Sequence, residues 1–117
     1  MSNFKELFVW QLAKKMAVAM YDITKEGSLN KDFGLRDQMR RAAVSIASNI
    51  AEGEGLGSNK QSVRHFYIAR GSVFELHTQL IIAHDIGYIE SDTFESLDNE
   101  CNRICAMITK LIQHRME

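Results

Sequence analysis

The sequence predicts an all-α protein, and more specifically an antiparallel, up-down-up-down four-helix bundle. Apolar residues recur at three- and four-residue spacing over four long segments. The 117 residues include no proline, and most of the seven glycines fall between those segments. Such helices bury their apolar stripes most simply against one another. A chain of this length corresponds to about one domain, so residues 1–117 are expected to fold as one unit.

The first predicted helix covers residues 4–26 and the second covers residues 35–52. Asn3 and Glu6 have the spacing of a capping box before the first helix, and Gly27 suits the left-handed position after its end. Glycines at positions 53, 55 and 57 are expected to break the chain after the second helix. The two apolar stripes are Val9, Leu12, Ala13, Met16, Met20 and Ile23, and then Leu35, Met39, Ala42, Ala43, Ile46 and Ile50.

The third predicted helix covers residues 59–86 and the fourth covers residues 92–114. Ser58 with Gln61, and Asp92 with Glu95, have capping-box spacing, and Gly87 ends the third helix. The stripes are Phe66, Ala69, Val73, Leu76, Leu80 and Ala83, and then Leu97, Cys101, Ile104, Ile108 and Leu111.

The amino-acid composition limits the classes of protein to which this chain can belong. The hydrophobic fraction of 45% and the charged fraction of 25% are those of an ordinary globular protein. No apolar run approaches the ~18 residues of a membrane helix, and residues 1–6 do not resemble a signal peptide, so a cytoplasmic protein without membrane contacts is expected. Cys101 and Cys105 lie one turn apart. They fit either two buried apolar side chains or half of a metal site.

The second and third helices are expected to form a hairpin about Leu56. That register places Ala42 and Ala43 opposite Gly71 and Ser72, where small residues would allow close approach of the backbones; an exposed, tolerated glycine is the alternative. The same register brings Arg41 near Glu75. We expect a buried ion pair there that fixes the register, continued by a polar stripe of Ser45, Asn49 and Glu52.

Patterns that indicate catalysis are weak. His77 and His84 are two helical turns apart, about 10 Å, which is too far to bind one metal together. The serines lack a paired base and a nucleophile elbow. We therefore expect no enzyme activity, cofactor, metal or small-molecule substrate. The remaining enzyme hypothesis requires Ser45, Asn49 and Glu52 to line a solvent-open pocket.

Two sets of residues suggest interactions. Arg36 and Arg40, and Lys60 and Arg64, are pairs one turn apart that either contact an anionic partner or are solvated. A pI near 6.4 predicts only weak, salt-sensitive binding of nucleic acid. Apolar residues outside the main stripes exceed what one core can bury, which favours a subunit interface. The candidates for it are Trp10, Tyr21, Tyr67 and Phe74.

Two motifs resemble those of the bacterial proteins encoded in intervening sequences of 23S ribosomal RNA genes. Residues 41–53 (RAAVSIASNIAEG) are similar to the central motif of that family, and residues 69–76 (ARGSVFEL) to its second motif. Residues 4–10 with Ala13, and residues 33–35, are similar as well. The resemblance extends over nearly the whole chain.

The resemblance implies four-helix protomers that assemble into barrel-shaped homopentamers. Related accessory proteins of diversity-generating retroelements bind nucleic acid and a reverse transcriptase. This chain has Ala47 where the family often has proline, lacks a proline before the second helix, and is not strongly basic. We expect a non-enzymatic scaffold or accessory protein for an RNA-associated or protein partner. The alternative is a purely structural homo-oligomer that binds no nucleic acid.

Overall fold

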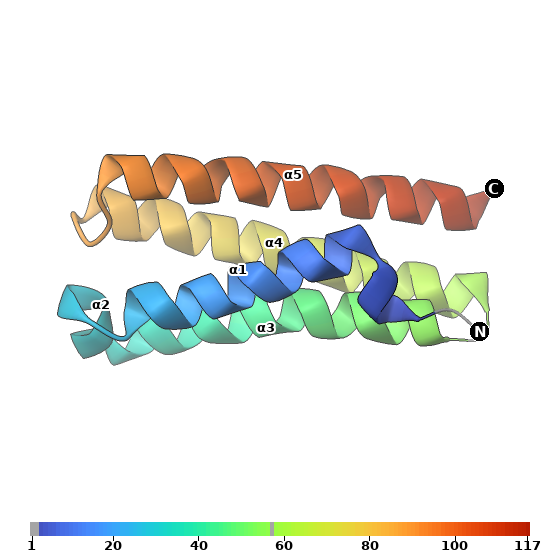
Figure 1. The fold of residues 1–117 in the computed structure, drawn as a ribbon, viewed down its shortest axis with the longest axis horizontal. Helices are drawn as coiled ribbons and strands as arrows, with labels where there is room; N and C mark the ends of the chain where they lie inside the picture. The colour runs from blue at the N-terminus through green and yellow to red at the C-terminus, as the bar shows by residue number, and fades with distance from the viewer. Residues whose placement is uncertain (1–2, 57) are drawn as a thin grey trace.

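The chain is all-helical in the computed structural model, which describes residues 3–56 and 58–117. The long helices are α1 (Phe8–Thr24), α3 (Phe33–Gly55), α4 (Asn59–Asp85) and α5 (Ser91–Met116), accompanied by a 3₁₀ turn, η1 (Phe4–Glu6), and the short α2 (Gly27–Lys31). Successive long helices run in opposite directions, side by side (Figure 1). The all-α prediction is confirmed, with five α-helices where four were expected and no strand in the described ranges.

The first predicted helix is interrupted near its start. Leu7 is extended, at φ −69° and ψ 123°, and separates η1 from α1. Asn3 Oδ1 accepts a hydrogen bond from the Lys5 backbone N–H at 3.0 Å, so Asn3 caps η1. Gly27 has the predicted left-handed φ, +68°, but it opens α2 instead of a plain connection. α2 forms because Leu29, only 2% exposed, is buried in the core.

The second predicted helix is longer at both ends. Asp32 Oδ1 accepts from the Leu35 N–H at 3.2 Å, so α3 starts at Phe33. The prediction that Gly53 and Gly55 break the chain is wrong, because both lie inside α3. Gly53 is buried, and a Cβ there would lie 2.5 Å from Phe66 Cε1. Packing therefore explains this glycine; the expected break at position 57 lies outside the described residues.

The ends of α4 follow the sequence, whereas the start of α5 does not. Ser58 Oγ accepts from the Gln61 N–H at 3.3 Å, and Gly87 takes a left-handed φ of +86°. The capping box predicted at Asp92 is wrong. α5 begins one residue earlier, after Glu90, whose side chain makes no capping hydrogen bond.

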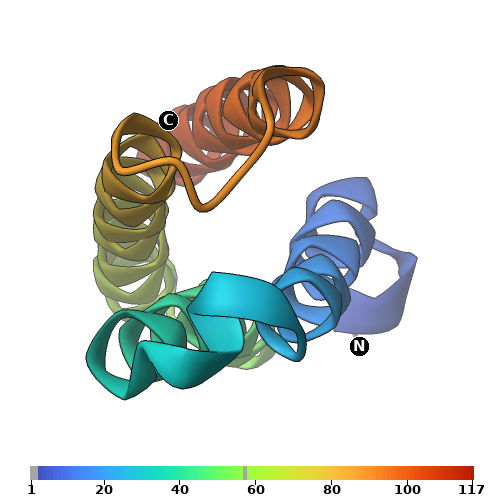
Figure 2. The ribbon, with the colours of Figure 1, turned by 90° about the vertical axis from the view of Figure 1, so that its left-hand side faces the viewer.

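The core runs along the long axis of a molecule that measures 44 × 20 × 20 Å. α3 packs against both α1 and α4, which lie on two neighbouring sides of it, and α5 packs mainly on α4 (Figure 2). No helix within the described ranges is both long and apolar enough to cross a membrane. The largest fully buried apolar side chains are Met20, Met39, Ile46, Ile50, Phe66, Val73, Leu76, Leu80, Cys101, Ile104 and Ile108.

Candidate interaction surfaces

A line of polar side chains closes the outer side of the contact between α3 and α4; we call it the α3–α4 polar seam. Arg41 Nη2 donates to Glu75 Oε2 at 2.7 Å and to Gln38 Oε1 at 2.7 Å. The predicted partners therefore meet. Their side chains are 57% and 39% exposed in the protomer, so the prediction of a buried pair is wrong. The pair lies on the surface because both residues point away from the core stripes.

The seam continues through hydroxyl and amide groups. Ser45 Oγ lies 2.9 Å from Ser72 Oγ, and Asn49 Nδ2 donates to the Ser45 carbonyl at 2.9 Å and to Ser45 Oγ at 3.1 Å. None of these neighbours is a base that could activate the Ser45 hydroxyl. The groups satisfy one another across the helix contact. The seam thus links α3 and α4 within the protomer through Ser45 and Ser72, and the register and assembly role expected for Ser45 and Asn49 stays a prediction.

His65, which the sequence analysis did not single out, completes the seam. Its Nδ1 lies 3.1 Å from Asn49 Oδ1 and 3.3 Å from Glu52 Oε2. Because the Asn49 amide NH₂ already donates to Ser45, Asn49 presents its oxygen to the imidazole. The network therefore assigns the proton to His65 Nδ1. The hairpin register about Leu56 was the signal that could have found this contact.

Gly71 does not bring α3 and α4 together. It is exposed on the outer side of α4, and a Cβ there would meet nothing within 4 Å. The predicted close approach to Ala42 and Ala43 is wrong within the protomer, since those two alanines are fully buried while Gly71 faces outward. Gly71 is instead an exposed glycine, which was the alternative interpretation of the sequence.

A buried cluster at the α3–α4 turn was also not predicted. Arg115, near the end of α5, pairs with Glu54, and their side chains are only 19% and 8% exposed. Ser62 Oγ donates to the Gly53 carbonyl at 2.6 Å, and the Arg115 guanidinium lies over the Phe66 ring at 5.6 Å. This cluster attaches the C-terminal helix to the turn. Its partners are about sixty residues apart, so no local pattern reveals it.

The four candidate contacts for an anionic partner divide into two pairs. Arg36 donates to the Asn30 carbonyl and pairs with Asp37, and Arg40 Nε donates to Thr24 Oγ1 at 2.7 Å while lying over the Tyr21 ring. Both guanidiniums are thus used within the chain. Lys60 and Arg64 are exposed on the first two turns of α4. Contact of Lys60 and Arg64 with an anionic partner stays a prediction.

Large apolar side chains form an exposed ridge on the outer side of α4. Tyr67, Phe74 and Ile81 repeat every seven residues and are 46%, 55% and 42% exposed. Ile68 and Ile82, 45% and 46% exposed, form a second line beside Glu75. Gly71 and Thr78 lie between the two lines, as helical geometry requires. We call these seven residues the α4 ridge: Tyr67, Ile68, Gly71, Phe74, Thr78, Ile81 and Ile82.

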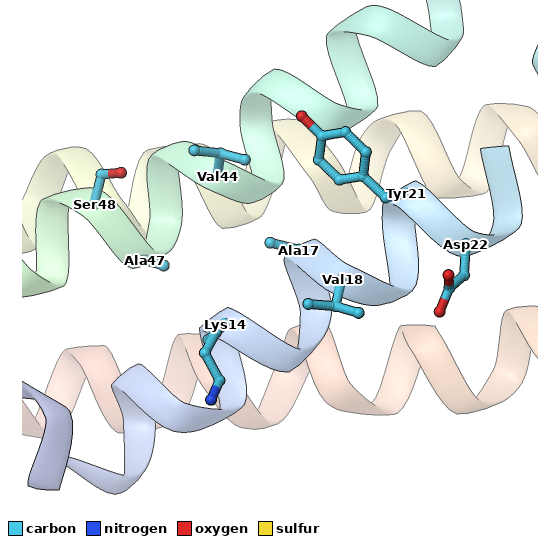
Figure 3. A pocket seen from close by; sticks show the side chains of 8 residues that line it. All are labelled: Lys14, Ala17, Val18, Tyr21, Asp22, Val44, Ala47 and Ser48. Carbon is cyan, nitrogen blue, oxygen red and sulfur yellow. The ribbon is translucent and has the colours of Figure 1, made fainter. Parts of the chain in front are cut away.

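A second uncovered apolar surface lies between α1 and α3. It is a groove of about 290 Å³ in which Ala17, Val18 and Tyr21 of α1 face Val44 and Ala47 of α3 (Figure 3). Lys14, Asp22 and Ser48 complete its lining, and we call it the α1–α3 groove. Val18, 56% exposed, is the most exposed of its large apolar side chains.

Trp10 differs from the other three aromatic candidates for an interface. Its ring packs against the core and makes an edge-to-face contact with Phe4, with centroids 5.1 Å apart. Much of Trp10 is therefore covered within the chain. Tyr21, Tyr67 and Phe74 remain about half exposed, and they belong to the groove and the ridge.

The cysteines fit the apolar interpretation. Cys101 is 1% exposed, and burial, followed by the nearby charges of Asp98 and Glu100, raises the pKa of its thiol to about 12. Among the described residues there is no group of three or more His, Cys, Asp or Glu side chains placed to hold a metal ion. His77 instead contacts Asp98 of α5, with Nε2 2.5 Å from Oδ1.

Comparisons with known proteins identify the family. A solved structure from Bacteroides thetaiotaomicron, described as a protein of unknown function from the S23 ribosomal protein family, superimposes with a TM-score of 0.81 at 24% identity, covering 89% of this chain and 97% of that one. A comparison with curated proteins found no match. The family model for 23S rRNA-intervening sequence proteins matches residues 5–110. The chain therefore belongs to the 23S rRNA-intervening sequence protein family.

Proposed function

We propose that the protein is a non-enzymatic scaffold that assembles with copies of itself and presents a surface to an RNA-associated partner. The observation that carries the proposal is the pair of uncovered apolar surfaces, the α4 ridge and the α1–α3 groove. Contiguous exposed apolar surface on a small protein marks an interaction site. Subunits of one chain are the simplest partners, because most soluble oligomers are homo-oligomers.

The subunit number that we propose is five, from the resemblance to a family of homopentamers. The protomer would use its four long helices as the wall of the assembly. We also place the protein in the cytoplasm, which agrees with its free cysteines, Cys101 and Cys105. Light scattering at micromolar concentration tests assembly directly: a particle of about five times the 13.3 kDa chain supports the proposal, and a monomer contradicts it.

The RNA-associated role is supported by the family to which the chain belongs and by one pair of exposed basic residues. Family members are named for 23S ribosomal RNA intervening sequences, and Lys60 and Arg64 offer exposed positive charge one turn apart. Several protomers in one assembly would repeat this pair, and repeated weak contacts add through multivalency. Binding of this kind depends strongly on salt, because phosphate contacts release counterions.

A filter-binding titration with structured RNA at low and high salt tests this role. We expect binding at low salt that weakens at high salt, and a further loss in the Lys60→Gln/Arg64→Gln variant. Lys15→Gln/Lys110→Gln is the matched control, since it removes the same charge from other exposed positions. No binding at either salt concentration, or equal loss in both variants, would contradict the RNA contact.

The second candidate function is a purely structural homo-oligomer. It is favoured by the engagement of Arg36 and Arg40 within the chain and by the net charge of −1, which gives no basic field. An assembled particle without RNA binding would select this alternative.

A further inference from the structure

We infer that the α4 ridge of one copy docks into the α1–α3 groove of the next copy, so that the assembly is a closed, head-to-tail ring. The inference rests on the proposed self-assembly and specifies which surfaces meet. α1 and α4 flank α3 on two neighbouring sides, so the groove between α1 and α3 and the ridge on the outer side of α4 are on different faces of the protomer (Figure 2). Two different complementary faces produce a heterologous contact.

The two surfaces lie at the same height along the long axis. Val18 and Val44 line the same stretch of the groove, and Ser45, the residue after Val44, contacts Ser72 of α4. The centre of the groove is therefore level with Gly71, which lies between Tyr67 and Phe74 in the ridge. Rotation about an axis parallel to the helices brings the two surfaces together without a shift along the axis. That condition allows a ring to close instead of forming a filament.

The shapes of the two surfaces are complementary at this height. Val18 is an exposed apolar side chain of the groove, whereas Gly71 leaves open space on α4 bounded by larger side chains on both sides. A side chain of one helix that inserts among four residues of another is the usual packing of parallel or antiparallel helices. In this arrangement Val18 fills the space above Gly71, and Tyr67 and Phe74 flank it.

The charges of the two halves agree with this pairing. Residues 3–56, which carry the groove, hold eight Lys and Arg against seven Asp and Glu. Residues 58–117, which carry the ridge, hold six against eight. A contact of groove with ridge therefore joins halves of opposite net sign, whereas contacts of like with like join halves of the same sign.

A mixing experiment with two charged variants tests the inference. Phe74→Asp disables the ridge and Val18→Asp disables the groove; both residues are more than half exposed, so the protomer keeps its fold, as circular dichroism would show. We expect each variant alone to sediment at 13.3 kDa and an equimolar mixture to give a particle of twice that mass, because one intact ridge meets one intact groove. Phe33→Asp, at a position 64% exposed outside both surfaces, is the matched control and should assemble like the wild type.

Thiol cross-linking gives a second test that does not depend on dissociation. We expect a short thiol–thiol cross-linker to join Val18→Cys chains to Gly71→Cys chains in a mixture, but neither chain to itself beyond the wild-type background from Cys101 and Cys105. The double variant should give a ladder whose largest product counts the subunits of the ring.

Failure of the docking inference can be distinguished from failure of the proposed self-assembly. Cross-linking of Gly71→Cys to itself, or full assembly of Val18→Asp, would overturn the inference and leave the proposed self-assembly intact. A monomeric wild-type protein would overturn both.

Discussion

Gly53 and Gly71 both lie inside long helices, yet they face different surroundings. A Cβ on Gly53 would lie 2.5 Å from the ring of Phe66, whereas a Cβ on Gly71 would meet nothing within 4 Å. The first glycine is explained by the packing of this chain. The second has no role in the protomer, although a glycine in mid-helix costs about 1 kcal/mol relative to alanine. The α3–α4 turn is therefore tightly packed at Gly53, whereas the α4 ridge is uncovered at Gly71 in the protomer.

The largest expected effect is at the buried ion pair of the turn. Glu54→Gln removes the charge that Arg115 faces in a pair whose side chains are 8% and 19% exposed. Breaking one partner of a buried pair costs about 3–5 kcal/mol, because the remaining charge stays desolvated. We expect that loss of unfolding free energy in urea titration. Glu95→Gln, at an exposed position of α5, is the control and should change little. A loss below 1 kcal/mol would show that the turn is not the tightly packed region described above.

Gly53→Ala should have the next largest effect. The added methyl group meets the Phe66 ring, which is 0% exposed and covered by Arg115, so the ring has little room to move. Overpacking of this kind costs about 1–3 kcal/mol, offset in part by the better helix propensity of alanine. We expect a lower urea midpoint with an unchanged slope. Stabilisation by this substitution would contradict the expectation, because it would mean that the Phe66 ring can shift to accommodate the added methyl group at little cost.

Features of the fold could be predicted from the sequence where they depend on neighbouring residues or on the pairing of two helices in one hairpin. The apolar stripes, the Ser58 cap and the Arg41–Glu75 contact follow from helical period, capping chemistry and the register about Leu56. Gly53 was misinterpreted because a glycine that breaks a helix and a glycine that admits a neighbouring ring look identical in sequence. The Glu54–Arg115 pair depends on where α5 ends relative to a turn sixty residues earlier, which no pattern encodes.

The residues of the candidate surfaces were predictable from sequence only in part, for the same physical reason. Exposure of Tyr67 and Phe74 was predictable, because both fall outside the main stripe of α4. Trp10 also falls outside its stripe, but it is partly covered by Phe4. The extended Leu7 separates η1 from α1 and lets Phe4 contact the Trp10 ring. Sequence reasoning could not distinguish Arg36 and Arg40 from Lys60 and Arg64. Arg36 and Arg40 are engaged by Asn30 and Thr24, and the position of those two residues relative to α3 cannot be predicted from a local pattern.

Gly71→Ala reverses the sign of the effect expected at Gly53. With open space around the position and a helical backbone, alanine should stabilise the protomer by about 0.5–1 kcal/mol. The measurement is urea unfolding at a concentration low enough to keep the protein monomeric. Destabilisation would show that α4 bends or packs at Gly71 in a way that this structure does not contain, and the contrast between the two glycines would then fail.

The smallest effect is expected at the exposed pair of the α3–α4 polar seam. Glu75→Gln removes a contact whose partners are 39% and 57% exposed, and such pairs contribute about 0–1 kcal/mol. Thermal unfolding of dilute protein should therefore be nearly unchanged. If the same variant lowers the midpoint strongly only at concentrations where the protein assembles, Glu75 is desolvated by a neighbouring copy, because burial by a subunit is what converts a weak surface pair into a costly one to break. A strong effect at both concentrations would contradict the exposed geometry of the pair itself.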